Sequence, residues 1–247
     1  MSDTLYLSLW YPNLRLAALA DKLTAVLSTF AAHGGEARVY SATVWPVGWS
    51  ETPVFQQVYG RRILAAGVEA SPQDPLGALP QDAVAEALEQ LHDDYAYEFQ
   101  IGWNLWELES PGEPGPSTAL RSAQDDKVSP FPSLHSGSIQ QNKVLWEPRW
   151  VRQPRLVRVV GYGPLFDEGA YQADGHIRID FGSDAPFLED DVELDSVGAG
   201  HVAENVVQLV ALAGALEKAS GATARLLWSE LGESLAERLA LRLGVRN

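Results

Sequence analysis

The sequence predicts an α+β protein made of antiparallel sheets with helices packed on one face. Two local patterns predict this class. Strictly alternating apolar and polar residues, typical of half-buried strands, occur in several segments. Other segments carry apolar residues every three or four positions, as amphipathic helices do. The composition, 46% hydrophobic and 21% charged, is that of an ordinary globular chain, so we expect most of it to fold.

The first strand and helix are predicted at the N-terminus. Three leucines alternate with polar or aromatic residues from Leu5 to Leu9, and Pro12 ends this strand. A helix follows from Leu16, and Gly34 is suited to the left-handed turn that ends many helices. Its inner face is predicted to hold Leu19, Leu23, Val26, Leu27 and Phe30.

The rest of the first half adds three strands and a helix. Residues 37–45 and 53–59 are rich in β-branched and aromatic types and indicate two strands joined by a turn. Asp82 is placed to cap a short helix after them. The clearest strand spans 95–108, with Tyr95, Tyr97, Phe99, Ile101, Trp103 and Leu105 on its buried side. The order βαββαβ is that of a ferredoxin-like sandwich.

The second half is separated from the first by a segment rich in Pro, Ser and Gly. Residues 110–142 show no sustained period and predict a long loop or linker between halves at 1–109 and 143–247. Strands are expected at 144–150, 156–162 and 176–181, followed by a helix at 201–220, a strand at 224–228 and a final helix carrying Leu231, Leu235 and Leu239. The two halves are expected to share an interface or to form one domain.

Charge and cysteine content exclude several classes of function. The 33 acidic and 18 basic residues give a formal charge of −15, which disfavours nucleic-acid binding and favours a basic protein partner. Acidity also serves solubility alone. The chain has no cysteine, which excludes disulfides and thiolate chemistry. We expect no membrane segment and a cytoplasmic location, because the longest apolar run, 206–216, is interrupted by Gln208.

An acidic cluster is the candidate metal site. Asp190, Asp191 and Glu193 are consecutive or nearly so, and carboxylate oxygens are the ligands that Ca²⁺ and Mg²⁺ prefer. The spacing lacks the order of an EF-hand loop, and a solvated acidic turn explains the cluster equally. A divalent cation is therefore the one cofactor considered, and otherwise none is expected.

Two residues near one strand are the candidate catalytic pair. His176 and Asp180 are predicted on one face of the strand at 176–181, where a carboxylate and an imidazole would serve acid–base chemistry. A surface position for His176 is the alternative. The chain lacks the His-Glu-x-x-His and Gly-x-Ser-x-Gly motifs of zinc and serine hydrolases.

Tryptophans and arginines are the candidate binding residues. Trp106 points away from the buried face of its strand, so it needs cover from the second half of the chain or from a ligand or partner. Arg149 and Arg152 are interleaved with Trp146 and Trp150 in the most basic stretch of the chain. They are suited to hold an anion or an acidic peptide, or to pair with acidic residues of the same chain.

The leading functional interpretation is a non-catalytic protein that binds a protein partner or itself. One version is an acidic inhibitor or immunity-type protein that masks a basic partner. The alternatives are a metal-assisted hydrolase that uses the acidic cluster between residues 180 and 195, and a small-ligand-binding protein with a tryptophan-lined pocket between the halves.

Overall fold

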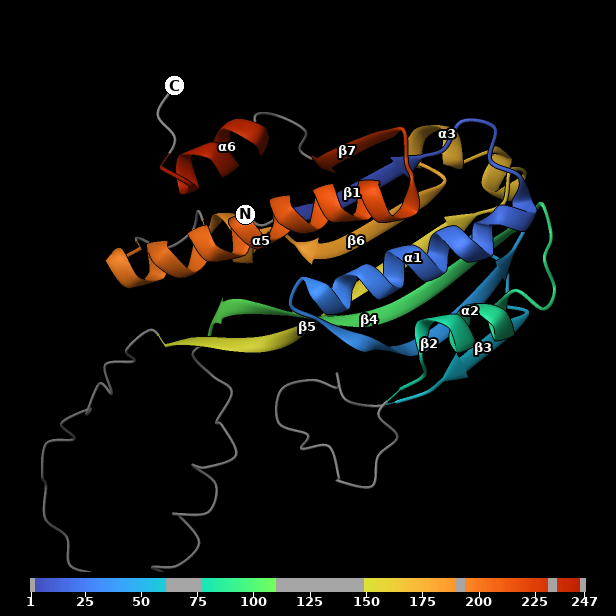
Figure 1. The fold of residues 1–247 in the computed structure, drawn as a ribbon, viewed down its shortest axis with the longest axis horizontal. Helices are drawn as coiled ribbons and strands as arrows, with labels where there is room; N and C mark the ends of the chain where they lie inside the picture. Colours follow the sequence, from blue (N-terminus) through green and yellow to red (C-terminus); the bar gives the residue numbers. More distant parts are fainter. Residues whose placement is uncertain (1–2, 61–76, 110–148, 190–193, 231–234, 245–247) are drawn as a thin grey trace, which may run out of the picture.

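The computed structural model is an α+β fold with one seven-stranded antiparallel sheet, which confirms the predicted class (Figure 1). The structure describes residues 3–60, 77–109, 149–189, 194–230 and 235–244. The strand order is β3-β2-β4-β5-β6-β1-β7. The strands are β1 (Thr4–Trp10), β2 (Gly35–Pro46), β3 (Phe55–Val58), β4 (Tyr95–Leu108), β5 (Trp150–Tyr162), β6 (Ile177–Ser183) and β7 (Ala224–Ser229).

The longer helices cover one face of this sheet, as Figure 1 shows. Helix α5 packs on α1 and reaches β4 and β7, while α2 packs on β2. The α-helices are α1 (Leu19–Ala32), α2 (Pro80–Ala87), α3 (Tyr171–Asp174), α4 (Ala185–Leu188), α5 (Ser196–Ser220) and α6 (Leu235–Arg242). Two short 3₁₀ turns, η1 (Leu16–Ala18) and η2 (Phe166–Glu168), complete the described elements.

The ferredoxin-like arrangement is not confirmed, although the first elements do follow the order βαββαβ. Strand β1 pairs with β6 and β7, far along the chain, instead of with β2–β4. Strands β4 and β5 pair from Ala96 opposite Tyr162 to Leu108 opposite Trp150. Strands from both predicted halves of the chain therefore belong to one sheet, while residues 110–142 and most of the strand expected at 144–150 lie outside the described part.

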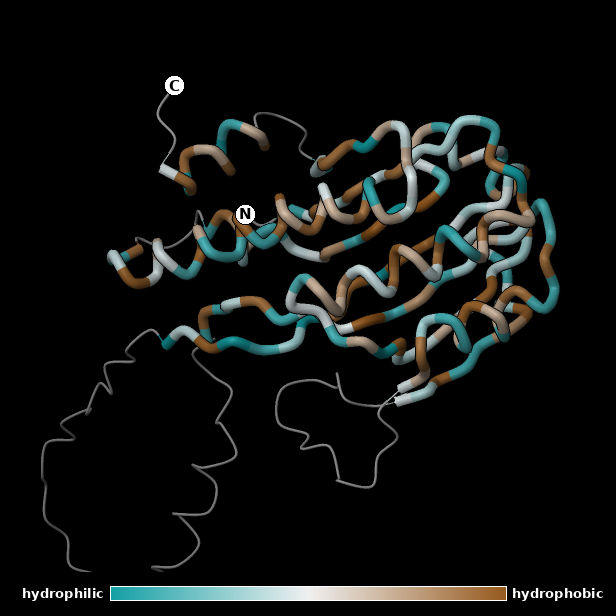
Figure 2. Tube along the Cα trace, viewed as in Figure 1, coloured by the Kyte–Doolittle hydropathy of each residue, from teal (hydrophilic) through white to brown (hydrophobic). Residues whose placement is uncertain are grey.

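The main core lies between the sheet and the helices. The predicted inward side of β4 is confirmed, since Phe99, Trp103 and Leu105 are fully buried. The predicted helix face is also correct: Leu19, Leu23, Val26, Leu27 and Phe30 are all buried. Figure 2 shows hydrophobic residues recurring along the strands and the helices that face them. This burial is the dominant stabilising contribution to the fold.

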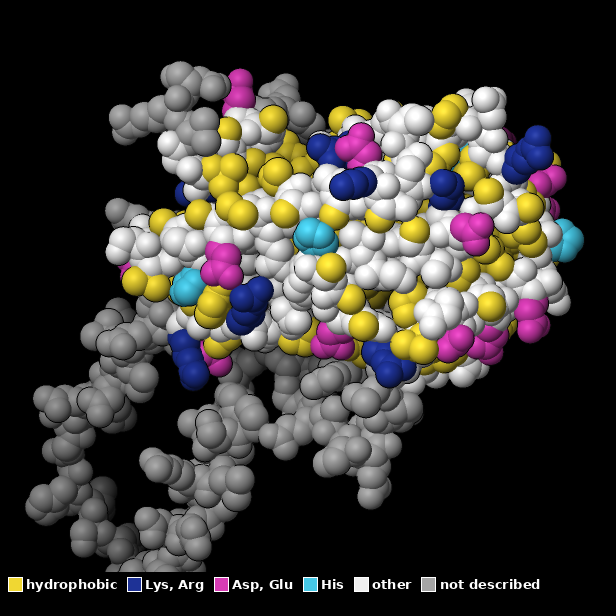
Figure 3. Space-filling view, viewed as in Figure 1, with side chains coloured by type: hydrophobic (Ala, Val, Ile, Leu, Met, Phe, Trp, Pro, Cys, Tyr) yellow, Lys and Arg dark blue, Asp and Glu magenta, His cyan; other side chains and the backbone are white. Residues whose placement is uncertain are grey.

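Helix α5 is longer than predicted. It begins at Ser196 because Asp195 caps it, accepting a hydrogen bond from the Gly198 amide at 2.7 Å. Gly221, at φ +70°, ends it as predicted. By length and composition α5 is the one described helix apolar enough to cross a membrane, and 39% of its most apolar stretch is buried inside the protein. Val207 and Val210 are exposed on it, and Figure 3 shows apolar side chains gathered near α5 and α6.

The opposite face of the sheet has a second, smaller core at one end. Ala96, Val160, Tyr162 and Phe166 are buried together there, with Trp45 and Trp49 packed against them. Trp49 meets Phe166 edge-on, with ring centroids 5.1 Å apart. The segment between β5 and β6 thus folds over the end of the sheet, which places its residues beside the end of β1.

Candidate functional site

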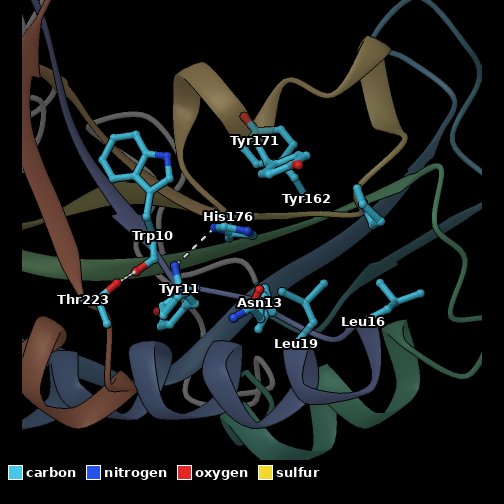
Figure 4. Close-up of a pocket in the computed structure, with 12 residues that line it drawn as sticks. Trp10, Tyr11, Asn13, Leu16, Leu19, Tyr162, Tyr171, His176 and Thr223 are labelled. Carbon is cyan, nitrogen blue, oxygen red and sulfur yellow. Dashed lines mark hydrogen bonds between the residues drawn. The ribbon is translucent and has the colours of Figure 1, made fainter.

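A pocket of about 460 Å³ opens at the end of the sheet where β1 and β5 finish and β6 and β7 begin (Figure 4). Four aromatic side chains and one histidine line it: Trp10, Tyr11, Tyr162, Tyr171 and His176. Its other described lining residues are Pro12, Asn13, Leu14, Leu16, Leu19, Pro164 and Thr223. This volume falls in the range typical of small-molecule sites.

Strand ends position these side chains. Trp10 is the last residue of β1, Tyr162 is the last of β5, and Tyr171 begins α3. The carbonyl of Trp10 accepts a hydrogen bond from the Thr223 amide at 2.9 Å, so β7 holds the rim on one side. The leucines of the opposite wall are Leu14, just before η1, Leu16 of η1 and Leu19 at the start of α1. The pocket is thus assembled from three distant parts of the chain.

The orientation of His176 follows from the way β1 ends. The Tyr11 amide donates to Nδ1 of His176 at 3.2 Å, beyond the last backbone pair between β1 and β6, Leu9 with Ile177. Because Nδ1 accepts this bond, the proton of the neutral imidazole resides on Nε2. Nε2 has no hydrogen-bond partner among the described residues and is not sealed from solvent. His176 therefore offers one free donor to a ligand.

Glycine is required immediately before this histidine. Gly175 has φ +89° and ψ 156°, a region that is almost restricted to glycine. A Cβ there would lie 2.8 Å from the Leu9 amide nitrogen. The close approach of Gly175 to β1 is what brings the imidazole of His176 within reach of Tyr11.

Burial sets the ionisation of the pocket residues. Desolvation lowers the pKa of His176, so the imidazole is neutral at neutral pH. Desolvation raises the pKa of Tyr11 to about 12, with Ser220 acting in the opposite sense, and desolvation raises the pKa of Tyr162 as well. Both phenols therefore remain protonated at neutral pH, and the walls of the pocket are uncharged.

The lowered pKa of His176 predicts a pH effect on stability. The unfolded chain takes up the proton more readily, so this contribution to stability is complete above the unfolded pKa of about 6.5 and is lost as pH falls below it. We expect His176→Asn, which keeps an acceptor near Nδ1 but does not titrate, to reduce the fall in unfolding free energy between about pH 7.5 and about pH 5.5. Urea titrations measure this, with the exposed His92→Asn as control. An equal fall in both variants contradicts the prediction.

The predicted catalytic pair is not joined in the structure. Asp180, largely buried on β6, accepts from Arg158 at 2.6 Å and from the Gly182 amide at 2.8 Å. His176 instead contacts Tyr11 and Tyr171. The predicted metal ligands Asp190, Asp191 and Glu193 lie outside the described residues, and the described part of the chain contains no cluster of three His, Asp or Glu side chains arranged to hold a metal ion.

The predicted binding tryptophans are brought together, under the first half of α5. Trp106 stacks on His201 with ring centroids 3.9 Å apart, and Trp150 lies 5.7 Å from the same ring. The Trp106 indole donates to Glu204 at 3.0 Å. The second half of the chain thus supplies cover for Trp106. Trp146 lies outside the described residues.

Of the two predicted arginines, Arg152 uses side-chain partners of the same chain, and Arg149 contributes a backbone contact. Arg152 forms an ion pair with Glu204 at 3.2 Å and lies over the Trp106 ring. Arg149 accepts a hydrogen bond through its backbone carbonyl from the Glu109 amide at 2.9 Å. Since the Arg152 pair is well exposed, it contributes little to stability.

Asn205 fixes α5 to the end of β4 beside these residues. It is fully buried; its Oδ1 accepts from the Trp106 amide at 3.0 Å, and its Nδ2 donates to the carbonyls of Trp106 and Pro186, both at 2.8 Å. We expect Asn205→Ala to lower the unfolding free energy by about 2–4 kcal/mol, because it leaves buried backbone groups unpaired. Denaturant unfolding measures this loss. The exposed neighbour Val207→Ala is the control, and an equally small change in both variants would contradict the prediction.

No protein family, curated protein or solved structure matches the chain. The pocket itself was missed by reading the sequence, although the strand pattern does single out His176 as a candidate residue. Its other residues carry no motif, and the available signal was the combination Gly175–His176 at the start of a predicted strand.

Proposed function

We propose that this protein is a non-catalytic binding protein that holds a small molecule in the pocket at His176. The observation that carries the proposal is a cavity lined by four aromatic side chains into which a single oriented histidine offers a free N–H. Concave, mostly apolar sites with few convergent polar groups are the usual form of small-ligand sites. The two candidate catalytic residues do not contact each other: His176 accepts a hydrogen bond from the Tyr11 amide, and Asp180 pairs with Arg158.

Indole N–H signals provide the test. Proton–nitrogen correlation NMR with a library of aromatic fragments is expected to shift the Trp10 indole signal and leave that of Trp106 in place, because Trp10 lines the pocket and Trp106 packs under α5. His176→Ala is expected to weaken these shifts, whereas the exposed His92→Ala leaves them unchanged. Fragments that leave Trp10 unaffected, or that respond identically in both variants, would overturn the proposal.

A protein partner is the second candidate, and the face of the sheet opposite the helices favours it. Tyr6 and Trp228 stack there with centroids 4.5 Å apart, and Leu226 beside them is 52% exposed. Arg158 is also accessible on this face. Tyr6 and Trp228 are half-buried, and aromatic and arginine side chains are enriched at protein interfaces. The formal charge of −15 favours a basic partner, as an inhibitor or immunity-type protein would require.

The second candidate is tested with a double variant. Tyr6→Ala with Trp228→Ala is expected to lose a partner that the wild-type protein retains in affinity capture, and rising salt is expected to weaken that retention. Native mass spectrometry distinguishes a partner of fixed stoichiometry from self-association. Retention that is independent of both the substitutions and salt would remove this candidate.

A further inference from the structure

The chemistry of the pocket walls restricts the class of ligand that the pocket accepts. Among the described residues that line it there is no Asp, Glu, Lys or Arg. This is notable in a chain with 33 acidic residues. A ligand carrying a formal charge would lose hydration on entry without gaining a charged partner, and burying an unpaired ion is costly.

Two cations beside the pocket are already engaged, and Arg15, exposed between the lining residues Leu14 and Leu16, does not itself line the pocket. Lys22 lies over the ring of Tyr11, with Nζ 5.3 Å from its centroid, and donates to the carbonyl of Ser220 at 2.7 Å. Arg178 lies over the ring of Tyr162 and pairs with Asp174. Both cations therefore stand near rings that line the pocket, which makes those rings poor partners for a ligand cation.

Of the polar side chains that line the pocket, which include Asn13 and Tyr171, the imidazole of His176 is oriented by a backbone hydrogen bond that leaves its donor for a ligand. Nε2 of His176 carries the proton because Nδ1 accepts from the Tyr11 amide. In Figure 4 the imidazole lies between Tyr11 on one side and Tyr162 and Tyr171 on the other. A flat molecule seated beside the imidazole, against the aromatic and leucine walls, would reach Nε2 with an acceptor group at its edge.

We infer that the pocket selects an uncharged, flat ring compound that bears a carbonyl-type hydrogen-bond acceptor, and that it rejects anions and cations of the same shape. This inference rests on the proposed small-molecule function and specifies its ligand class. The acceptor group receives the Nε2–H of His176, while the ring contacts the aromatic and leucine walls.

Three probes of one shape test the inference: naphthamide is neutral with an acceptor, naphthoate is an anion, and naphthylmethylammonium is a cation. Their dissociation constants are measured at about pH 7.5 from the Trp10 indole shift. We expect naphthamide to bind at least roughly tenfold more tightly than either ion. We expect His176→Ala to weaken naphthamide roughly three- to tenfold and to leave naphthalene, which has no acceptor, unchanged.

The outcomes separate this inference from the function on which it rests. Failure of naphthalene and all three probes to shift Trp10 would count against the small-molecule function itself. Similar binding by the amide and both ions would leave the function in place and overturn the selection for uncharged ligands. Equal effects of His176→Ala on naphthamide and naphthalene would overturn the role of the Nε2 hydrogen bond. The variant His92→Ala controls for general effects of removing a histidine.

Discussion

Trp103→Ala is expected to lower the free energy of unfolding by about 3–5 kcal/mol, the range for removing a large buried aromatic side chain. Trp103 is fully buried on the helix-facing side of β4. Its ring contacts Phe30 of α1, Phe181 of β6 and Phe187 of α4, with centroids 6.2, 5.2 and 5.8 Å away. It thus connects the helical layer to the middle of the sheet, and a cavity there cannot be closed by one neighbour.

A hydrogen bond adds to this packing. The Trp103 indole donates to the carbonyl of His33 at 2.8 Å, at the end of α1. Trp103→Phe keeps most of the ring contacts but loses this bond, so we expect it to cost less than the alanine variant. Urea denaturation followed by circular dichroism measures both. Equal destabilisation by Phe and Ala, or a loss below about 1 kcal/mol for Ala, would show that the site repacks or that Trp103 is not a central contact.

Local patterns explain why this part of the fold was predictable. The alternation that placed Trp103 on the buried side of β4 is a property of neighbouring residues, and the structure confirms it. The position of β1 was not predictable in the same way, because its pairing with β6 and β7 joins residues more than a hundred positions apart. Sequence periodicity shows which side of a strand is buried, but it does not show which other strand will pair with it in the sheet.

The starts of the helices were less predictable than the buried sides of the strands but more predictable than the pairing of the strands. Asp82 was expected to cap α2, yet the helix begins at Pro80, with Asp82 in its first turn. Proline is well suited to the first helical position, since its missing N–H would have no partner there. For α5, the capping signal at Asp195 lies several residues before the strongly apolar stretch that predicted the helix, which explains why its start was placed too late.

The candidate site was predictable only in part, because tertiary structure assembles it. The strand pattern indicates His176, but its neighbours Trp10 and Tyr11 approach it only when β1 and β6 pair. Trp106 and Trp150 stand out by their size and do meet, at His201 of α5. No spacing rule in the sequence distinguishes the aromatic residues that line the pocket from the tryptophans that meet beside α5.

Gly175→Ala is expected to destabilise the protein by about 3 kcal/mol and to remove ligand binding at the pocket. The backbone of Gly175 lies at φ +89° and ψ 156°, where an L-residue is strained by about 1–3 kcal/mol. Its new Cβ would also meet Leu9 of β1, 2.8 Å from the amide nitrogen and 3.0 Å from the carbonyl oxygen. Because both of these are backbone atoms, the clash is relieved only by moving β1 away from the start of β6.

That movement connects stability to the pocket. Separation of β1 from β6 breaks the hydrogen bond from the Tyr11 amide to His176, so the imidazole loses the contact that orients it. Gly200→Ala is the matched control: Gly200 lies in α5, and an added Cβ there would have no described atom within 4 Å beyond the adjoining backbone of its own helix. At that position, alanine is expected to raise the unfolding free energy by up to about 1 kcal/mol, because glycine is a poor helix former. Denaturant unfolding and naphthamide titration of both variants measure the two effects, and a Gly175→Ala protein that keeps wild-type affinity would show that His176 is not oriented through the pairing of β1 with β6.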